Sequence, residues 1–177
     1  MSEMKPDKWM SLVALATAIM AVLAAITTLY LGKYSSRAIL NQGQETSQWA
    51  YYQAKSIKSY VYEIQKQKLE LETMTSGNKP MVMMNRYSQL IKDYDRQIKR
   101  YDAEKAEIKA TADALAKAKE DAQARAGNFG YGLIFLQIAI MLASISALTK
   151  KKPLFYLGIA TVSGWIFFFL DAIFLFY

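Results

Sequence analysis

The hydrophobic positions of this chain are concentrated in three runs that carry no charge. Residues 9–32 and residues 126–149 are each a run of 24 uncharged residues, and residues 153–170 are a run of 18. About 20 apolar residues in an α-helix are enough to cross a hydrocarbon core of about 30 Å. The pattern therefore predicts three transmembrane helices. The first run is longer than the apolar region of a cleavable signal peptide, so we expect it to be a permanent anchor.

The long polar segment between the first two runs follows a seven-residue repeat. Before residue 75 the repeat consists of Ala50, Ile57, Ile64 and Leu71, and after residue 80 of Tyr87, Tyr94, Tyr101, Ile108, Leu115 and Ala122. A repeat of this period is typical of helical coiled coils. The sequence TSGNKP at 75–80 interrupts it, and its Gly, Asn and Pro favour the end of one helix and the start of another. The segment is thus predicted to be an antiparallel helical hairpin whose seams pack within the chain or against other subunits.

Together these patterns predict an all-α membrane protein with a coiled-coil hairpin between its first and second transmembrane helices. The expected segments are a polar N-terminus at 1–8, transmembrane helices at 9–32, 128–148 and 154–177, the hairpin at 33–127 with its turn at 75–80, and a basic turn at 149–153.

Composition changes this picture mainly by what it excludes. The chain has no His and no Cys, so it lacks the commonest metal ligands, general base and thiol nucleophile. It also contains no phosphate-binding or dinucleotide-binding glycine motif. We therefore expect no enzymatic activity, no cofactor and no metal site.

The net charge of +7 bears on topology. Three spans place the N-terminus and the 149–153 turn on one side and the hairpin on the other, and five basic residues flank the membrane on each side. The positive-inside rule gives short loops more weight, so it favours a cytoplasmic basic turn and a periplasmic hairpin.

Each apolar run also carries small residues at helical spacing, which let helix backbones approach closely. These residues are Ala14, Ala18, Ala21 and Ala25 in the first run, Ala139 and Ala143 in the second, and Gly158 and Gly164 in the third. They are predicted to serve either contacts within a three-helix bundle or contacts between chains. Self-assembly is favoured, because three helices have few internal contacts to use all three faces.

Polar side chains within the apolar runs suggest a second feature. Asp171 directly follows the third run and is the ionisable residue of the transmembrane helix predicted at 154–177, where a carboxylate is costly in a bilayer. Gln137, Thr27 and Thr28 are expected in the same leaflet, so a polar cluster with Asp171 is predicted within or between chains. The alternative is that Asp171 lies at the level of the lipid headgroups.

The hairpin contains one aromatic and basic segment, QWAYYQAKSIK. Its Trp49, Tyr51, Tyr52 and Lys55 fit a packing contact within the hairpin, between subunits, or with another protein. Nucleic acid is a less favoured partner, because the charges of the hairpin are dispersed along both arms rather than gathered in a patch.

This segment and the order of spans and hairpin resemble an uncharacterised bacterial family of small membrane proteins, known only as a domain of unknown function. The resemblance implies a bacterial cytoplasmic membrane protein and supplies no activity. From the residues we expect a homo-oligomeric scaffold or pore-like assembly in the lipid bilayer. An accessory subunit that docks onto a larger membrane complex through the hairpin is the alternative.

Overall fold

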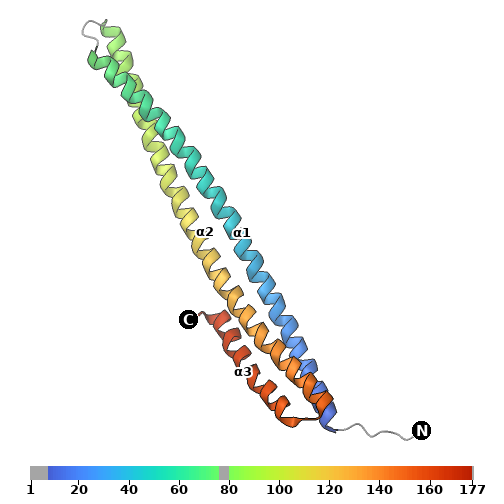
Figure 1. The fold of residues 1–177 in the computed structure, drawn as a ribbon. Coiled ribbons are helices and arrows are strands. Elements are labelled where there is room, and N and C mark those ends of the chain that lie inside the picture. The colour runs from blue at the N-terminus through green and yellow to red at the C-terminus, as the bar shows by residue number, and fades with distance from the viewer. Residues whose placement is uncertain (1–7, 76–79, 177) are drawn as a thin grey trace. The chain divides into compact units, whose positions relative to one another are not determined.

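The computed structural model describes residues 8–75 and 80–176 and contains three helices (Figure 1). These are α1 (Lys8–Thr75), α2 (Met81–Thr149) and α3 (Lys152–Phe174). The described residues contain no strand, so the all-α prediction is confirmed for them. Most of the predicted 75–80 turn, residues 76–79, lies outside the described part. At its edges α1 ends at Thr75, and the carbonyl of Pro80 accepts hydrogen bonds from the first turn of α2.

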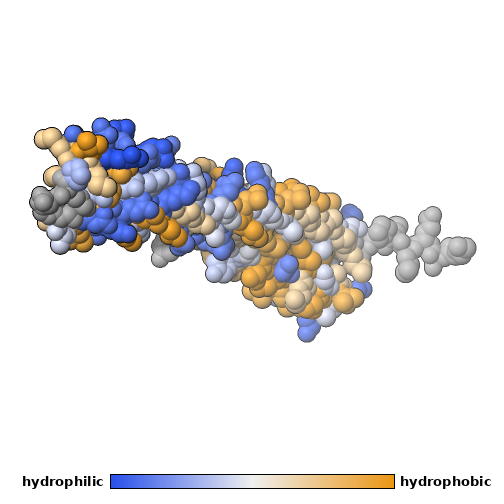
Figure 2. All heavy atoms as spheres, turned by 90° about the horizontal axis from the view of Figure 1, so that it is seen from above, coloured by the Kyte–Doolittle hydropathy of each residue, from blue (hydrophilic) through white to orange (hydrophobic). Residues whose placement is uncertain are grey.

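The chain divides into two compact units. The first, here called the apolar unit, comprises Met1–Leu40 and Ala118–Tyr177. The second, the polar unit, is Asn41–Lys117. Hydrophobic residues gather over the surface of the apolar unit, whereas hydrophilic residues dominate the polar unit (Figure 2). This division separates the three apolar runs from most of the charged sequence.

In the apolar unit, α2 and α3 are joined by Lys150 and Lys151 alone, a shorter connection than the predicted 149–153 turn. Lys150 has a positive φ of 55°, which allows the chain to reverse within two residues. The hydroxyl of Ser146 donates to the carbonyl of Lys151 at 2.9 Å, and Pro153 lies in the first turn of α3. Proline is tolerated there because the first helical N–H groups have no partner inside the helix.

The core of the apolar unit is small and draws on all three helices. It contains Val13 and Met20 of α1, Leu136, Ala139 and Ala143 of α2, and Phe155 of α3. The rings of Trp9 and Phe155 meet edge to face, with centroids 5.3 Å apart. Outside this core, large side chains such as Leu29 (74% exposed) and Leu148 (85% exposed) cover the surface. Three long helices with such apolar exteriors are compatible with membrane spans.

The polar unit is held together by a seam of aromatic and small residues. Tyr62 of α1 lies between Tyr94 and Tyr101 of α2, with ring centroids 5.7 and 5.9 Å away. Tyr101 and Ile108 are buried, so this part of the α2 repeat faces α1. On α1 the residues that face inward include Tyr52, Ser59, Lys66 and Thr73, which are also spaced by seven.

The repeat identified on α1 therefore does not pack against α2. Ile57, Ile64 and Leu71 are 64%, 65% and 65% exposed, and Ala50 is exposed as well. Of the two alternatives expected for this seam, packing within one chain does not hold for α1. The physical reason lies on the other side of α1, where Tyr62 meets the tyrosines of α2 and where Lys55 and Lys66 pair with Glu104 and Asp95. These contacts fix the rotation of α1.

Candidate functional site

Asp171, the carboxylate predicted to be a functional candidate, is buried near the end of α3 and bonded within the chain. Its Oδ2 accepts a hydrogen bond from Asn128 Nδ2 at 2.6 Å, and its Oδ1 accepts one from the backbone N–H of Phe176 at 2.9 Å. Arg125 donates to the carbonyls of Ala172 and Ile173 at 2.9 and 2.6 Å. These bonds satisfy the last carbonyls of α3 and fasten its end to α2.

The other members of the predicted polar cluster are placed elsewhere. Thr27 is buried, and its hydroxyl accepts a hydrogen bond from Trp165 Nε1 at 3.0 Å. It donates its own proton to the carbonyl of Leu23. Thr28 and Gln137 are both exposed. The structure thus joins Asp171 and Thr27 to partners other than those predicted, and it leaves Thr28 and Gln137 on the outer surface.

Two of the three small-residue faces are used inside the apolar unit. Ala139 and Ala143 are 0% and 1% exposed and lie against Gly158 of α3. A methyl group built on Gly158 would lie 3.1 Å from the carbonyl oxygen of Ala139. At Gly164 it would lie 2.7 Å from the ring of Phe135. Both glycines therefore allow α3 to approach α2 closely, as small residues do between membrane helices.

The third small-residue face lies on the outside. Ala14, Ala18, Ala21 and Ala25 of α1 are all exposed, whereas Val13, Met20 and Thr27 of the same helix are buried. The four alanines keep their spacing of four, three and four residues along one side of the helix. This surface, here called the alanine face, is a close-packing surface that residues 8–75 and 80–176 leave uncovered.

In the polar unit, Trp49 and Tyr52 are half-buried and pack edge to face at 5.7 Å. Tyr51 is 51% exposed, and the Lys55 ammonium lies 5.1 Å from the centre of its ring. Lys55 Nζ also forms an ion pair with Glu104 Oε2 at 2.6 Å. Lys55, which was predicted to serve a packing or docking contact, is therefore already paired with an acidic residue of the same chain.

An open groove of about 350 Å³ runs beside this pair. It is lined by Gln48, Tyr51, Lys55, Glu104, Glu107, Ile108 and Thr111. The hydrogen bond from Lys55 holds the pKa of Glu104 below its ordinary value of 4.5, and the same bond raises the pKa of Lys55. Lys55 and Glu104 are thus paired at neutral pH, and the groove presents a mostly polar surface with one aromatic ring, that of Tyr51.

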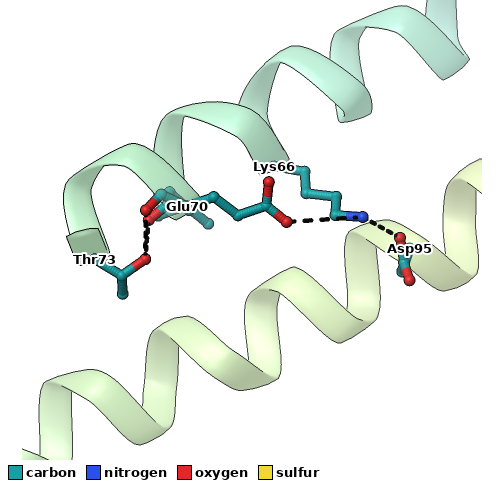
Figure 3. Close-up of polar contacts among 5 residues, drawn as sticks. Lys66, Glu70, Thr73 and Asp95 are labelled. Atoms are coloured by element: carbon teal, nitrogen blue, oxygen red, sulfur yellow. Dashed lines mark hydrogen bonds and ion pairs between the residues drawn. The ribbon is translucent and has the colours of Figure 1, made fainter.

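A second cross-helix ion pair lies further along the polar unit (Figure 3). Lys66 Nζ is 2.5 Å from Asp95 Oδ1 and 3.8 Å from Glu70 Oε1. The hydrogen bond from Lys66 lowers the pKa of Asp95. Because Lys55 pairs with Glu104 and Lys66 pairs with Asp95, the two helices run in opposite directions within this unit.

Sequence reasoning missed Asn128 and Trp165, the partners of Asp171 and Thr27. The short turn between α2 and α3 could have indicated that Asn128 is the partner of Asp171. Asp171 follows Lys151 by 20 residues and Asn128 precedes Lys150 by 22, so a tight antiparallel turn brings them level. Gln137 precedes Lys150 by only 13 residues and cannot lie at that level. No comparable count could have found Trp165, because α1 and α3 are not joined by a short turn.

Residues 9–175 match the family profile described as Domain of unknown function (DUF4337), and the chain belongs to this family. Comparisons with curated proteins and with solved structures each gave no match. Within residues 8–75 and 80–176, no group of three or more Asp or Glu side chains is placed to hold a metal ion. The features available to a functional hypothesis are therefore the two outward faces of α1 and the groove beside Tyr51.

Proposed function

We propose that this member of the DUF4337 family is a homo-oligomeric integral membrane scaffold. Its three apolar helices cross a bacterial cytoplasmic membrane, and the polar unit forms a helical hairpin on the periplasmic side. The chains meet through α1. A pore-like form of the assembly would turn Gln137 and Thr28 towards its axis, since these are the exposed polar residues of the predicted cluster.

The alanine face is the observation that carries this proposal. In lipid there is little hydrophobic force between helices, so their association depends on close backbone approach and on hydrogen bonds. The chain has already used Ala139, Ala143 and Gly158 for its own packing. Four alanines lie along one outer side of α1, and this supports a contact with the α1 helix of another copy of the chain.

Cross-linking in native membranes tests the proposal, because the chain has no cysteine of its own. We expect Ala21→Cys to form a disulfide-linked dimer when the membranes are oxidised with copper phenanthroline. Ala160→Cys is the matched control, since Ala160 is an exposed alanine of α3 in the same unit. Equal cross-linking of the two variants would contradict a specific contact through α1.

A bulky substitution on the alanine face tests the same contact in a second way. Ala21→Leu should reduce the mass of the purified assembly and leave the helix content unchanged, because residue 21 is exposed within one chain. If Ala21→Leu assembles like the wild type, the alanine face is not the contact.

An accessory role in a larger complex is supported by one observation, the groove beside Tyr51. Its lining is polar and aromatic, which suits a wet protein contact. This function would leave the purified chain monomeric. Loss of a co-purifying membrane complex from Tyr51→Ala, with the wild-type chain monomeric, would favour it over the scaffold.

A further inference from the structure

The outward side of α1 in the polar unit carries an aliphatic row that none of the described residues covers. We call it the outer seam: Ala50, Ala54, Ile57, Val61, Ile64 and Leu71. Its members alternate at steps of four and three residues up to Ile64, and Leu71 continues the row seven residues later. Ile57, Ile64 and Leu71 keep about two thirds of their surface exposed, and Val61 keeps 47%.

This row has the spacing of a coiled-coil core and not that of a solvated helix face. Repeats of 3.5 residues let side chains insert into holes on a facing helix. Inside the chain, α2 occupies the other side of α1, where Ser59 is 0% exposed and Tyr62 stacks against Tyr101. The outer seam therefore has the pattern for helix pairing and lacks a helix to pair with.

We infer that the outer seam pairs in parallel with the outer seam of a second copy of this chain. The inference rests on the proposed function, in which copies share one membrane and their α1 helices point the same way. It goes beyond that function by naming the surface, the register and the direction of a contact in the polar unit. A two-fold axis makes such a contact self-complementary, so one surface serves both copies.

The residues that border the outer seam are compatible with the same residues of a second copy of the chain. On one side they are Tyr51, Lys58, Gln65 and Glu72, and on the other Gln53, Tyr60, Gln67 and Met74. In a parallel coiled coil these flanks select the partner by charge. Here they carry one positive and one negative charge among eight residues, so they neither repel a copy nor require an oppositely charged protein. The parallel register sets Gln53 near Lys58, Tyr60 near Gln65, and Gln67 near Glu72 of the second copy.

One residue departs from the aliphatic pattern. Lys68 takes the core position between Ile64 and Leu71. A single lysine at such a position weakens a parallel pair and restricts its register and oligomer number. In the paired state the two Lys68 side chains face each other, which makes this residue a sensitive probe of direction.

Disulfide cross-linking of the full chain in membranes tests the pairing. We expect Ile64→Cys to give several-fold more dimer than Ala106→Cys, an exposed position on α2 of the same unit. A disulfide requires Cα atoms within about 7 Å. Same-residue links in Ile57→Cys, Ile64→Cys and Leu71→Cys together report a parallel, in-register contact, because an antiparallel pair centred on Ile64 would link only Ile64→Cys to itself. Equal dimer from both variants would overturn the inference, and so would links formed only between Ile57→Cys and Leu71→Cys chains, since these indicate an antiparallel pair.

Two charge variants test the same surface without a disulfide. Lys68→Leu should raise the dimer fraction several-fold, and Ile64→Glu should lower it with an unchanged thermal melt of the chain, because residue 64 is exposed within one copy. A dimer fraction that is the same in both variants as in the wild type would overturn the inference. Capture of a different protein by Ile64→Cys would overturn it as well.

The outcomes separate this inference from the proposed function. If Ala21→Cys forms dimers and Ile64→Cys does not, the scaffold stands and the outer seam does not pair. If neither forms dimers and the purified chain is a monomer, both fail.

Discussion

Replacing Gly158 by alanine tests how closely α2 and α3 approach in the apolar unit. The added methyl group would lie 3.1 Å from the carbonyl oxygen of Ala139, 3.2 Å from Leu142 Cβ and 3.6 Å from the backbone nitrogen of Ala143. Two of these neighbours are backbone atoms, so relief requires the helices to move apart. Overpacking of this kind typically costs about 1–3 kcal/mol.

Alanine also gains about 1 kcal/mol over glycine as a helix former. The net expectation for Gly158→Ala is therefore between no change and a loss of about 2 kcal/mol. Gly127→Ala is the matched control, because a methyl group there meets nothing within 4 Å and only the gain applies. We expect the two variants to differ by about 1–3 kcal/mol in the free energy of unfolding.

The assay is equilibrium unfolding in mixed micelles, followed by circular dichroism and by tryptophan fluorescence. Trp165 lies next to Gly164 on α3, so it contributes emission from the same pair of helices, beside that of Trp9 and Trp49. Equal stability of the Gly158→Ala and Gly127→Ala proteins would refute the reasoning, because it would mean that α3 does not rest on α2 at this point.

Three further predictions follow from single contacts. Trp165→Phe removes the hydrogen bond to Thr27 and should cost about 0.5–1.5 kcal/mol of unfolding free energy, whereas an unchanged value would mean that water or lipid replaces it. Ser59 is fully buried and its hydroxyl has no partner within the described residues, so Ser59→Ala should stabilise the chain by about 1 kcal/mol in thermal or chemical unfolding. The pKa of Glu104 lies below its ordinary 4.5 and that of Lys55 above its ordinary 10.5, so their ion pair stabilises the fold fully between these values and is lost in acid and in strong base. The difference in melting temperature between wild type and Glu104→Gln should therefore shrink as the pH falls below 4.5, and a constant difference would contradict the assigned pair.

The extent of the helices was predictable because it depends on local pattern. Uncharged runs and the absence of strand-like alternation give long helices whatever the rest of the chain does. The end of α1 at Thr75 and the start of α3 near Pro153 follow from residues that interrupt or begin helices.

Which side of α1 faces α2 was not predictable from aliphatic residues alone. The chain offers two rows at a spacing of seven, one with Ile57 and Ile64 and one with Ser59 and Lys66. The second row faces inward because Tyr62 meets two tyrosines and Lys66 meets Asp95. These are contacts between distant parts of the chain, and a count of hydrophobic positions contains no information about them.

The bonding of Asp171 was missed for a related reason. The sequence placed Asp171 and Gln137 in the same leaflet, and a leaflet groups residues by depth in the membrane but not by neighbour. The two-residue turn at Lys150 and Lys151 sets the register between α2 and α3, and that register brings Asn128 to Asp171.

The most direct test of the scaffold is the mass of the full chain purified in nanodiscs, measured by light scattering with the lipid contribution subtracted. One chain has a mass of 20.1 kDa. Self-assembly predicts a single species at two or more times that mass, reduced by Ala21→Leu, and pairing of the outer seam predicts a further reduction by Ile64→Glu. A species of one chain across the accessible concentration range would contradict the account.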